Sequence, residues 1–152
     1  MRGQGPYEDA EPLYQRALAA CERVLGAEHP DTLVTVDNLA YLYASQGRYG
    51  EAEPLCQRAL AARERVAGAE ELGTLGSVNN LAYLYQRQGR YGEAEPLYQR
   101  ATLGAERVLG ANHPSAKMFR SNWERLRANR RLPHGRRLWA KLFSSLARVR
   151  RR

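Results

Sequence analysis

Two asparagines occupy the same place in two nearly identical stretches of the sequence, Asn38 in DNLAYLY and Asn80 in NNLAYLY. A carboxamide carries both a hydrogen-bond donor and an acceptor, so it can hold a peptide backbone with little regard to that peptide's side chains. A tyrosine, Tyr41 or Tyr83, follows each asparagine three residues later and offers the flat amphipathic surface that binding sites favour. These residue types indicate recognition of a ligand rather than a chemical reaction.

Helical spacing places further side chains on the same face as the two asparagines. Residues three and four positions apart are neighbours on a helix, and this face lies largely off the stripe of Leu, Ala and Tyr that would form the core. The alternative is that the asparagines hydrogen-bond to neighbouring helices while the tyrosines only pack the wall. The expected binding face comprises Asp37, Asn38, Tyr41, Ala44 and Ser45 in the first copy and Asn79, Asn80, Tyr83, Gln86 and Arg87 in the next.

The residue types used in catalysis and metal binding do not occur in a pattern that would support either. The sequence has no Gly-rich phosphate loop, HExxH, GxSxG or GxGxxG. His29 and His113 each stand in an H-P turn before a predicted helix. The acidic residues recur as E-A-E-P at helix starts, where they favour the helix dipole. We therefore expect no enzyme, no cofactor and no metal site.

The cysteines and the hydropathy pattern predict a cytoplasmic protein. Cys21 and Cys56 fall on predicted helices without a CxxC pattern, which favours two reduced packing thiols. Such thiols suit a reducing compartment. No apolar run approaches the roughly 20 residues that span a bilayer, and the first residues lack the apolar core of a secretory signal.

The elements that would position the asparagines belong to an internal repeat of 42 residues. Residues 25–66 and 67–108 align without gaps and agree at 28 of 42 positions. Apolar residues recur at three- and four-residue steps, which predicts two helices per copy, over 32–46 and 50–66 in the first. A gapless repeat of helix pairs is typical of an all-α solenoid, in which each unit needs its neighbours to cover its apolar face.

Local residues mark where these helices should begin and end. Asp31 is expected to cap the first helix, and Gly47 is expected to end it in the left-handed conformation. Pro54 is expected in the first turn of the second helix, where a missing donor costs little. In the next copy Gly73 replaces the capping aspartate, so the helix start near Thr74 should be the loosest point of the stack.

The copies divide the chain into a central array, expected over 7–131, and two flanking segments. Residues 1–6 are expected to be disordered, and 132–152 to form a basic amphipathic helix. The expected units of the array are a half unit at 7–26, two full units at 27–68 and 69–110, and a degraded unit at 111–131.

The repeats resemble tetratricopeptide repeats, and more closely the 42-residue variety found in kinesin light chains. The likeness is carried by residues 25–60 and 67–101, with partial copies at 7–25 and 109–122. It implies a right-handed superhelix of antiparallel helix pairs whose first helices line a concave groove for extended peptides or partner helices. In this family the asparagine of N-L-A often faces the groove, which extends the expected binding face to Asn122.

The positive charge of the chain is concentrated near its C-terminus. Residues 1–116 hold 11 Lys and Arg against 15 Asp and Glu, whereas 117–152 hold 13 Lys and Arg and the single acid Glu124. Three roles fit this segment: a helix that caps the last unit, a basic amphipathic helix on an anionic membrane or a partner, and a segment that binds nucleic acid. The residues expected to make these contacts are Arg136, Arg137, Trp139, Lys141, Phe143, Arg148 and Arg150.

The sequence favours a non-enzymatic scaffold that binds a peptide or partner protein in the groove. The alternative is an adaptor that acts through its basic tail on an anionic membrane or on nucleic acid. Salt separates the two, because tail binding weakens steeply as the salt concentration rises. The array also begins with a second helix that lacks a first helix before it, and this open face predicts end-to-end self-association.

Overall fold

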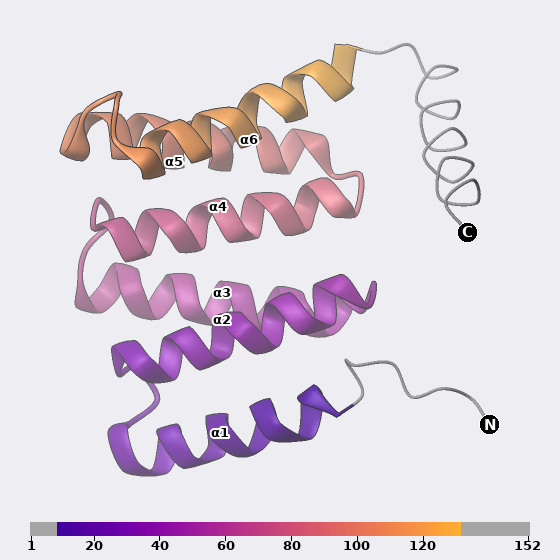
Figure 1. Ribbon diagram of the computed structural model, residues 1–152, viewed down its shortest axis with the longest axis vertical. Coiled ribbons are helices and arrows are strands. Elements are labelled where there is room, and N and C mark those ends of the chain that lie inside the picture. The colour runs from indigo at the N-terminus through magenta and orange to yellow at the C-terminus, as the bar shows by residue number, and fades with distance from the viewer. Residues whose placement is uncertain (1–8, 132–152) are drawn as a thin grey trace.

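The computed structural model describes residues 9–131, and these residues form six α-helices arranged as a stack (Figure 1). Each helix packs against the next along the chain, and α4 also contacts α6. Within the described residues the fold is the all-α solenoid that the repeat predicts. The helices are α1 (Ala10–Leu25), α2 (Pro30–Ser45), α3 (Tyr49–Val66), α4 (Leu72–Arg87), α5 (Tyr91–Leu109) and α6 (Pro114–Arg131).

Residues 1–8 and 132–152 lie outside the described part of the chain. The predictions of a disordered start and of a basic amphipathic C-terminal helix concern these residues. The expected tail contacts between Arg136 and Arg150 lie there too. None of the helices between residues 9 and 131 is both long and apolar enough to cross a bilayer.

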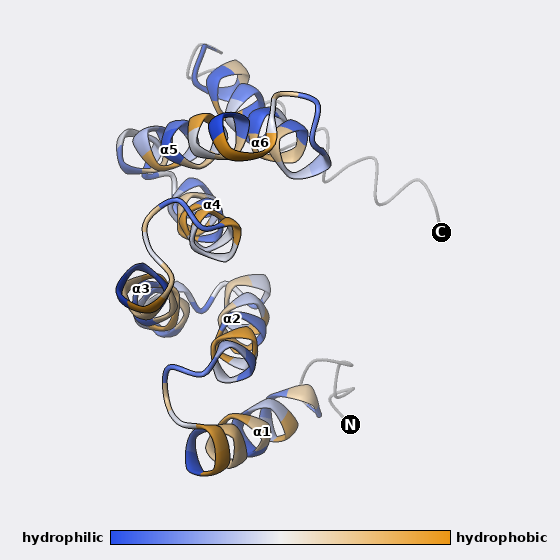
Figure 2. Cartoon of the chain, turned by 90° about the vertical axis from the view of Figure 1, so that its left-hand side faces the viewer, coloured by the Kyte–Doolittle hydropathy of each residue, from blue (hydrophilic) through white to orange (hydrophobic). Residues whose placement is uncertain are grey.

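The stack has two faces, because the first and the second helices of the pairs are displaced toward different sides of it (Figure 2). The first helices of the pairs are α2, α4 and α6, and the second helices are α1, α3 and α5. In Figure 2, α3 and α5 lie on one side and α2 and α6 on the other, with α4 set between them. The first helices therefore form a face of their own, with α4 as its floor.

Small residues let the helices approach one another closely. Alanines recur at the same phase of the repeat and are almost completely removed from solvent, which leaves room for neighbouring backbones. Larger apolar side chains, such as Leu84 and Leu126, fill the space between the pairs. The buried alanines of this set are Ala40, Ala52, Ala59, Ala82, Ala94 and Ala101.

The start of α2 differs from the expectation. The helix begins at Pro30, and Nδ1 of His29 accepts a hydrogen bond from the amide of Asp31 at 3.1 Å. The prediction that Asp31 caps this helix is therefore wrong. Proline favours the first helical position, which makes the residue before it the cap. His113 accepts the same bond from the amide of Ser115 before α6.

Other predicted helix ends had mixed outcomes. Gly47 has a φ of 75°, which confirms the left-handed end after α2. Pro54 lies inside α3, beyond its first turn, so the expectation for Pro54 is wrong and one internal hydrogen bond is absent there. At the start of α4, Glu71 replaces the missing aspartate and accepts a hydrogen bond from the amide of Thr74 at 3.2 Å. Low stability near Thr74 stays a prediction.

Ion pairs recur with the period of the sequence and join neighbouring second helices. Arg48 contacts Glu11 at 2.7 Å, and 42 residues later Arg90 contacts Glu53 at 2.8 Å. The Arg48 guanidinium also lies over the ring of Tyr43 at 4.3 Å, and its hydrogen bond lowers the pKa of the Glu11 carboxyl. These pairs are screened by solvent, so they fix the register of the units more than they stabilise the fold.

Candidate functional site

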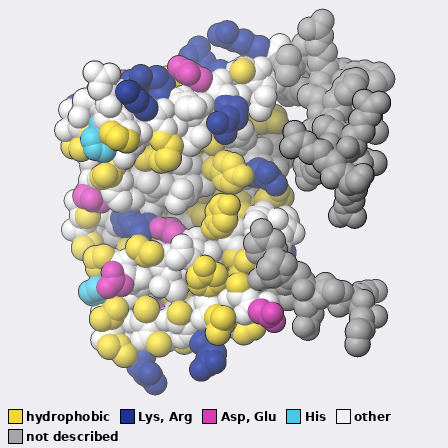
Figure 3. All heavy atoms as spheres, in the orientation of Figure 1, with side chains coloured by type: hydrophobic (Ala, Val, Ile, Leu, Met, Phe, Trp, Pro, Cys, Tyr) yellow, Lys and Arg dark blue, Asp and Glu magenta, His cyan; other side chains and the backbone are white. Residues whose placement is uncertain are grey.

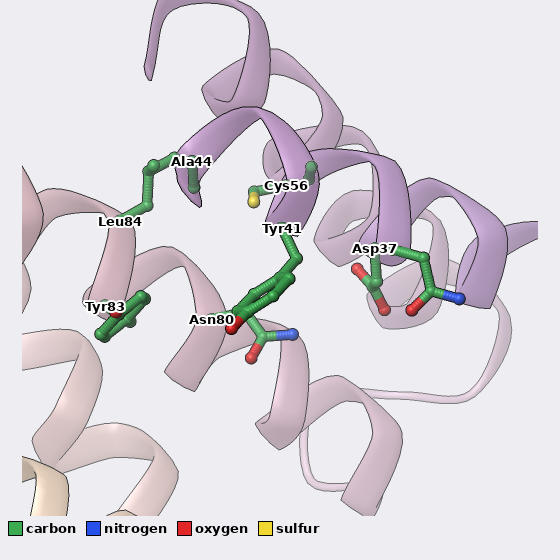
Figure 4. Close-up of a pocket in the computed structure, with 9 residues that line it drawn as sticks. Asp37, Tyr41, Ala44, Cys56, Asn80, Tyr83 and Leu84 are labelled. Atoms are coloured by element: carbon green, nitrogen blue, oxygen red, sulfur yellow. The ribbon is translucent and has the colours of Figure 1, made fainter. Parts of the chain in front are cut away.

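A pocket of about 210 Å³ lies between α2 and α4, on the face formed by the first helices. This face is hollowed near its centre, where hydrophobic side chains gather (Figure 3). In Figure 4, Tyr41 reaches from α2 toward Asn80 of α4. The exposed or half-buried lining residues are Asp37, Asn38, Tyr41, Asn80 and Tyr83, and the buried ones are Ala40, Ala44, Cys56 and Leu84.

The pocket exists because a small residue replaces a tyrosine of the repeat. Cys56 stands 42 positions after Tyr14 and 42 before Tyr98. Tyr98 is fully buried, and its hydroxyl donates a hydrogen bond to Oε1 of Gln86 at 2.7 Å. In the preceding unit Cys56 and Ala44 hold these two positions. Both the phenol and its amide partner are missing there, and their space stays open.

The amides of Asn38 and Asn80 are exposed at the pocket rim, as the helical phase predicts. Among the described residues, neither amide has a hydrogen-bond partner. Tyr41 is 69% exposed and Tyr83 39% exposed, so both rings are open to solvent at the pocket. The site therefore combines unused amide donors and acceptors with an apolar cavity.

Asp37 lines the pocket, but its carboxylate already has a partner. Nη1 of Arg63 lies 2.6 Å from Oδ2 of Asp37 and also donates to the hydroxyl of Ser77. Burial raises the pKa of the Asp37 carboxyl, and the nearby Arg63 guanidinium opposes this shift. In the next unit Asn79 stands for Asp37 and Ala105 for Arg63. The two members of the ion pair thus change together between repeats.

Three other residues of the expected face are engaged within the protein and do not line the pocket. Asn79 is only 7% exposed, and its Oδ1 accepts a hydrogen bond from Nδ2 of Asn122 at 3.1 Å. Gln86 holds the hydroxyl of Tyr98. Asn79 and Asn122 thus follow the alternative expectation, in which the asparagine forms a hydrogen bond with a neighbouring helix.

Arg87 lies beside the pocket rather than in it. Its guanidinium is 6.0 Å from the centre of the Tyr83 ring, and a hydrogen bond with Tyr49 raises its pKa. The positive charge therefore lies beside the aromatic rim, and the Arg87 side chain is exposed to solvent.

Ala44, which belongs to the expected face, lines the pocket, and three other lining residues were absent from that face: Ala40, Cys56 and Leu84. Ala40 and Cys56 belong to the apolar stripes of the repeat, so the helical pattern assigns them to the core. Cys56 carried a usable signal, because it breaks the series Tyr14, Cys56, Tyr98. A small residue at a position that otherwise holds a large one predicts either a cavity or a repacked core.

The chemistry available at this site is hydrogen bonding and apolar contact. Between residues 9 and 131, no cluster of His, Cys, Asp and Glu could hold a metal ion. The acidic group of the pocket, Asp37, is paired with Arg63. The pocket is thus suited to holding part of a ligand.

Comparison with known families agrees with the architecture. Three overlapping stretches of the chain, residues 1–65, 33–102 and 70–118, match the profile of the tetratricopeptide repeat. The chain belongs to the tetratricopeptide repeat family. Such repeats typically form non-enzymatic scaffolds for protein–protein interaction.

Solved tetratricopeptide structures superpose on most of the chain. The nearly identical TPR-like repeats of a Podosopora anserina protein classed with the kinesin light chains have a TM-score of 0.72 at 27% identity, covering 79% of this chain. A variant of that protein has a TM-score of 0.69 at 24% identity, covering 96% of this chain and 69% of its own. BtubC (BKLC) from P. vanneervenii has a TM-score of 0.65 at 18% identity, covering 84% of this chain and 59% of its own.

The two likenesses below 25% identity show the fold alone. The chain spans 57% of the length of the Podosopora anserina structure that is 27% identical to it. No curated protein matches the chain.

Proposed function

We propose that this tetratricopeptide protein is a non-enzymatic scaffold that binds an extended segment of a partner protein along the face formed by α2, α4 and α6. The observation that carries the proposal is the pocket between α2 and α4, which joins an apolar cavity to two exposed amides that have no partner among residues 9–131. A ligand backbone would hydrogen-bond with Asn38 and Asn80. One apolar side chain of the ligand would enter the cavity between Tyr41 and Tyr83.

The division of roles follows from the physical chemistry of the pocket. Amides can bind any backbone, so they support affinity without selecting a sequence. The cavity selects ligands that carry an apolar side chain at the matching position, because burying one such side chain contributes about 1.5–3 kcal/mol. The unpaired thiols of Cys21 and Cys56 support a reducing cytoplasmic location for this scaffold.

Filling the pocket with a large side chain should weaken this binding. Cys56→Tyr supplies the side chain that the repeat itself uses at Tyr98, so the fold has a precedent for it. We expect ligands selected from a random-peptide display library on the full chain to bind Cys56→Tyr about 10- to 100-fold more weakly, which corresponds to losing one buried apolar side chain. Titration calorimetry measures the change.

Two further variants complete the test. Asn38→Ala with Asn80→Ala should weaken the same peptides while leaving the cavity open. Cys21→Ala removes a thiol on α1, away from the pocket, and should leave the affinity unchanged. If the peptides bind wild type, Cys56→Tyr and the double asparagine variant equally well, and circular dichroism shows all of them equally helical, the proposal is wrong.

A further inference from the structure

Tyr98 shows what the repeat places between its helices at the position that Cys56 holds in the pocket. Its ring is fully buried, and its hydroxyl donates a hydrogen bond to Oε1 of Gln86 at 2.7 Å. Burial raises the pKa of this hydroxyl, the nearby Tyr83 adds to the shift, and Arg125 opposes it. The phenol therefore reaches the side of α4 that carries Gln86 and Tyr83.

The pocket is the equivalent space one unit earlier. Four residues around Tyr98 have repeat equivalents that line the pocket. Cys56 takes the place of Tyr98 itself, so the walls are kept and the ring that they would enclose is missing. In Figure 4 the side chains of Ala44, Cys56 and Tyr83 surround this open space. The equivalents are Ala44 for Gln86, Tyr41 for Tyr83, Tyr83 for Arg125 and Leu84 for Leu126.

The size and the chemistry of this space suit one aromatic ring. Its volume is about 210 Å³, and an apolar cavity of about 150 Å³ is large enough to bind benzene. Leu84 and Ala40 are almost completely buried and supply apolar walls. Burial raises the pKa of the Cys56 thiol to about 12, and the carboxylates of Asp37 and Glu53 add to this shift. The sulfur therefore stays neutral, and neutral sulfur makes favourable contacts with aromatic rings.

Residue 44 decides which substituent the ring can carry. Gln86 gives the hydroxyl of Tyr98 an acceptor, whereas the methyl group of Ala44 gives none. Ala44 is buried, so a hydroxyl group beside it would lie out of water and without a hydrogen bond, which is costly. The space left by the missing amide can instead hold a methyl group or another apolar substituent.

We propose that the pocket is a binding site for a single aromatic ring without a hydroxyl group, and that Ala44 is the residue that excludes the hydroxyl. The inference rests on the proposed function, and it names the side chain that a bound segment places in the cavity as phenylalanine rather than leucine or tyrosine. A free aromatic molecule of the same shape fits the same walls. In both cases the ring fills, between α3 and α4, the place that Tyr98 fills between α5 and α6, so binding stabilises the stack.

The probes are p-xylene and p-cresol, because they have nearly the same shape and differ by a methyl group in place of a hydroxyl group. The saturated control is 1,4-dimethylcyclohexane. Each compound is titrated into the full chain, and nitrogen–proton NMR spectra report binding through the backbone amides of Cys56 and Leu84. Once affinities are corrected for hydration by partition between water and cyclohexane, p-xylene should bind at least about threefold more tightly than its saturated analogue, since sulfur and aromatic walls favour a ring with π electrons.

Ala44→Gln supplies the missing acceptor and should change the ratio of the affinities for p-xylene and p-cresol. The amide takes part of the space of p-xylene and weakens its binding, while p-cresol gains a hydrogen bond to the amide. The preference should therefore move toward p-cresol by about 3- to 10-fold, the effect of one hydrogen bond. Cys56→Tyr, verified as helical by circular dichroism, should bind neither compound, because its own ring occupies the site.

Three results would overturn the aromatic site: no saturable binding of p-xylene to the folded wild type, equally tight binding of the saturated analogue, or a ratio that Ala44→Gln leaves unchanged. The last result needs only one small substitution, so it decides even if Cys56→Tyr does not fold.

Competition with the peptides selected on the full chain identifies the source of the ring. Displacement of the peptides by p-xylene assigns the ring to a side chain of the partner, whereas p-xylene binding without displacement assigns it to a free molecule. Peptides that bind while p-xylene does not would overturn this inference and leave the proposed scaffold standing. Saturable ring binding by a chain that selects no peptide would have the opposite consequence.

Discussion

Replacing Tyr98 by cysteine should lower the free energy of unfolding by about 3–5 kcal/mol, the range measured when a large buried side chain is truncated. Tyr98 is fully buried and lies in the main core cluster with Leu84 and Leu126. Its loss removes dispersion contacts and leaves a cavity between α4 and α6. Urea denaturation followed by circular dichroism measures the change.

The expected cavity has a counterpart in the same molecule. Tyr98→Cys together with Gln86→Ala copies the pair Cys56 and Ala44 into the next unit, so a second pocket should open there. Peptides that enter the first pocket through an apolar side chain should then occupy a second site. Calorimetric stoichiometry would detect it.

Tyr98→Phe is the matched control, because it keeps the ring and removes only the hydroxyl bonded to Gln86. It should cost about 1 kcal/mol, the net value of one hydrogen bond. If Tyr98→Cys unfolds within 1 kcal/mol of wild type, or if Tyr98→Phe costs as much as Tyr98→Cys, ring burial is not what stabilises this contact.

The repeat makes most of the fold predictable from the sequence. Two copies that agree without gaps fix the order and length of the helices, because each apolar step of three or four residues recurs at its own place. The predicted helices over 32–46 and 50–66 correspond to α2 at Pro30–Ser45 and α3 at Tyr49–Val66. The errors concern the place of Pro54 within α3 and the start of α2, where the single residue Pro30 decides which neighbour caps the helix.

The site is less predictable, because neighbouring residues on one helical face have different surroundings. Asn79 and Asn80 are adjacent in the sequence, yet Asn79 bonds to Asn122 of α6 while Asn80 faces the pocket. Helical phase cannot separate them, because the distinction is made by a helix more than 40 residues away. The cavity too depends on residues from different helices, because it is the space that the small side chains of Cys56 on α3 and Ala44 on α2 leave empty.

Positions at which the repeats differ indicate local features, such as the pocket, that the shared periodic pattern does not show. The series Tyr14, Cys56, Tyr98 marks the pocket, and the joint change of Asp37 and Arg63 to Asn79 and Ala105 marks an ion pair. Both can be read from one sequence once the copies are compared position by position. Reading them as structure still requires knowing that the two changed positions touch.

Arg63→Ala should destabilise the protein by about 3 kcal/mol, at the lower end of what breaking a buried ion pair costs. The Arg63 and Asp37 side chains are 13% and 20% exposed and lie 2.6 Å apart. The variant leaves the Asp37 carboxylate buried without a partner and removes a donor from Ser77. Asp37→Asn combined with Arg63→Ala copies the second unit and should lie within about 1 kcal/mol of wild type, because a buried pair and its neutral replacement have similar net energies.

The pH dependence of this pair gives an independent check. The folded pKa of Asp37 is raised above its unfolded value because burial disfavours the charged form. The folded state therefore takes up a proton first as the pH falls, and the stability of wild type relative to the double variant should rise through that window. The same advantage should be lost as the pH rises through the folded pKa. A wild type that loses stability relative to the double variant on acidification would show that Arg63 outweighs burial at Asp37, and that the pair stabilises the fold rather than being tolerated by it.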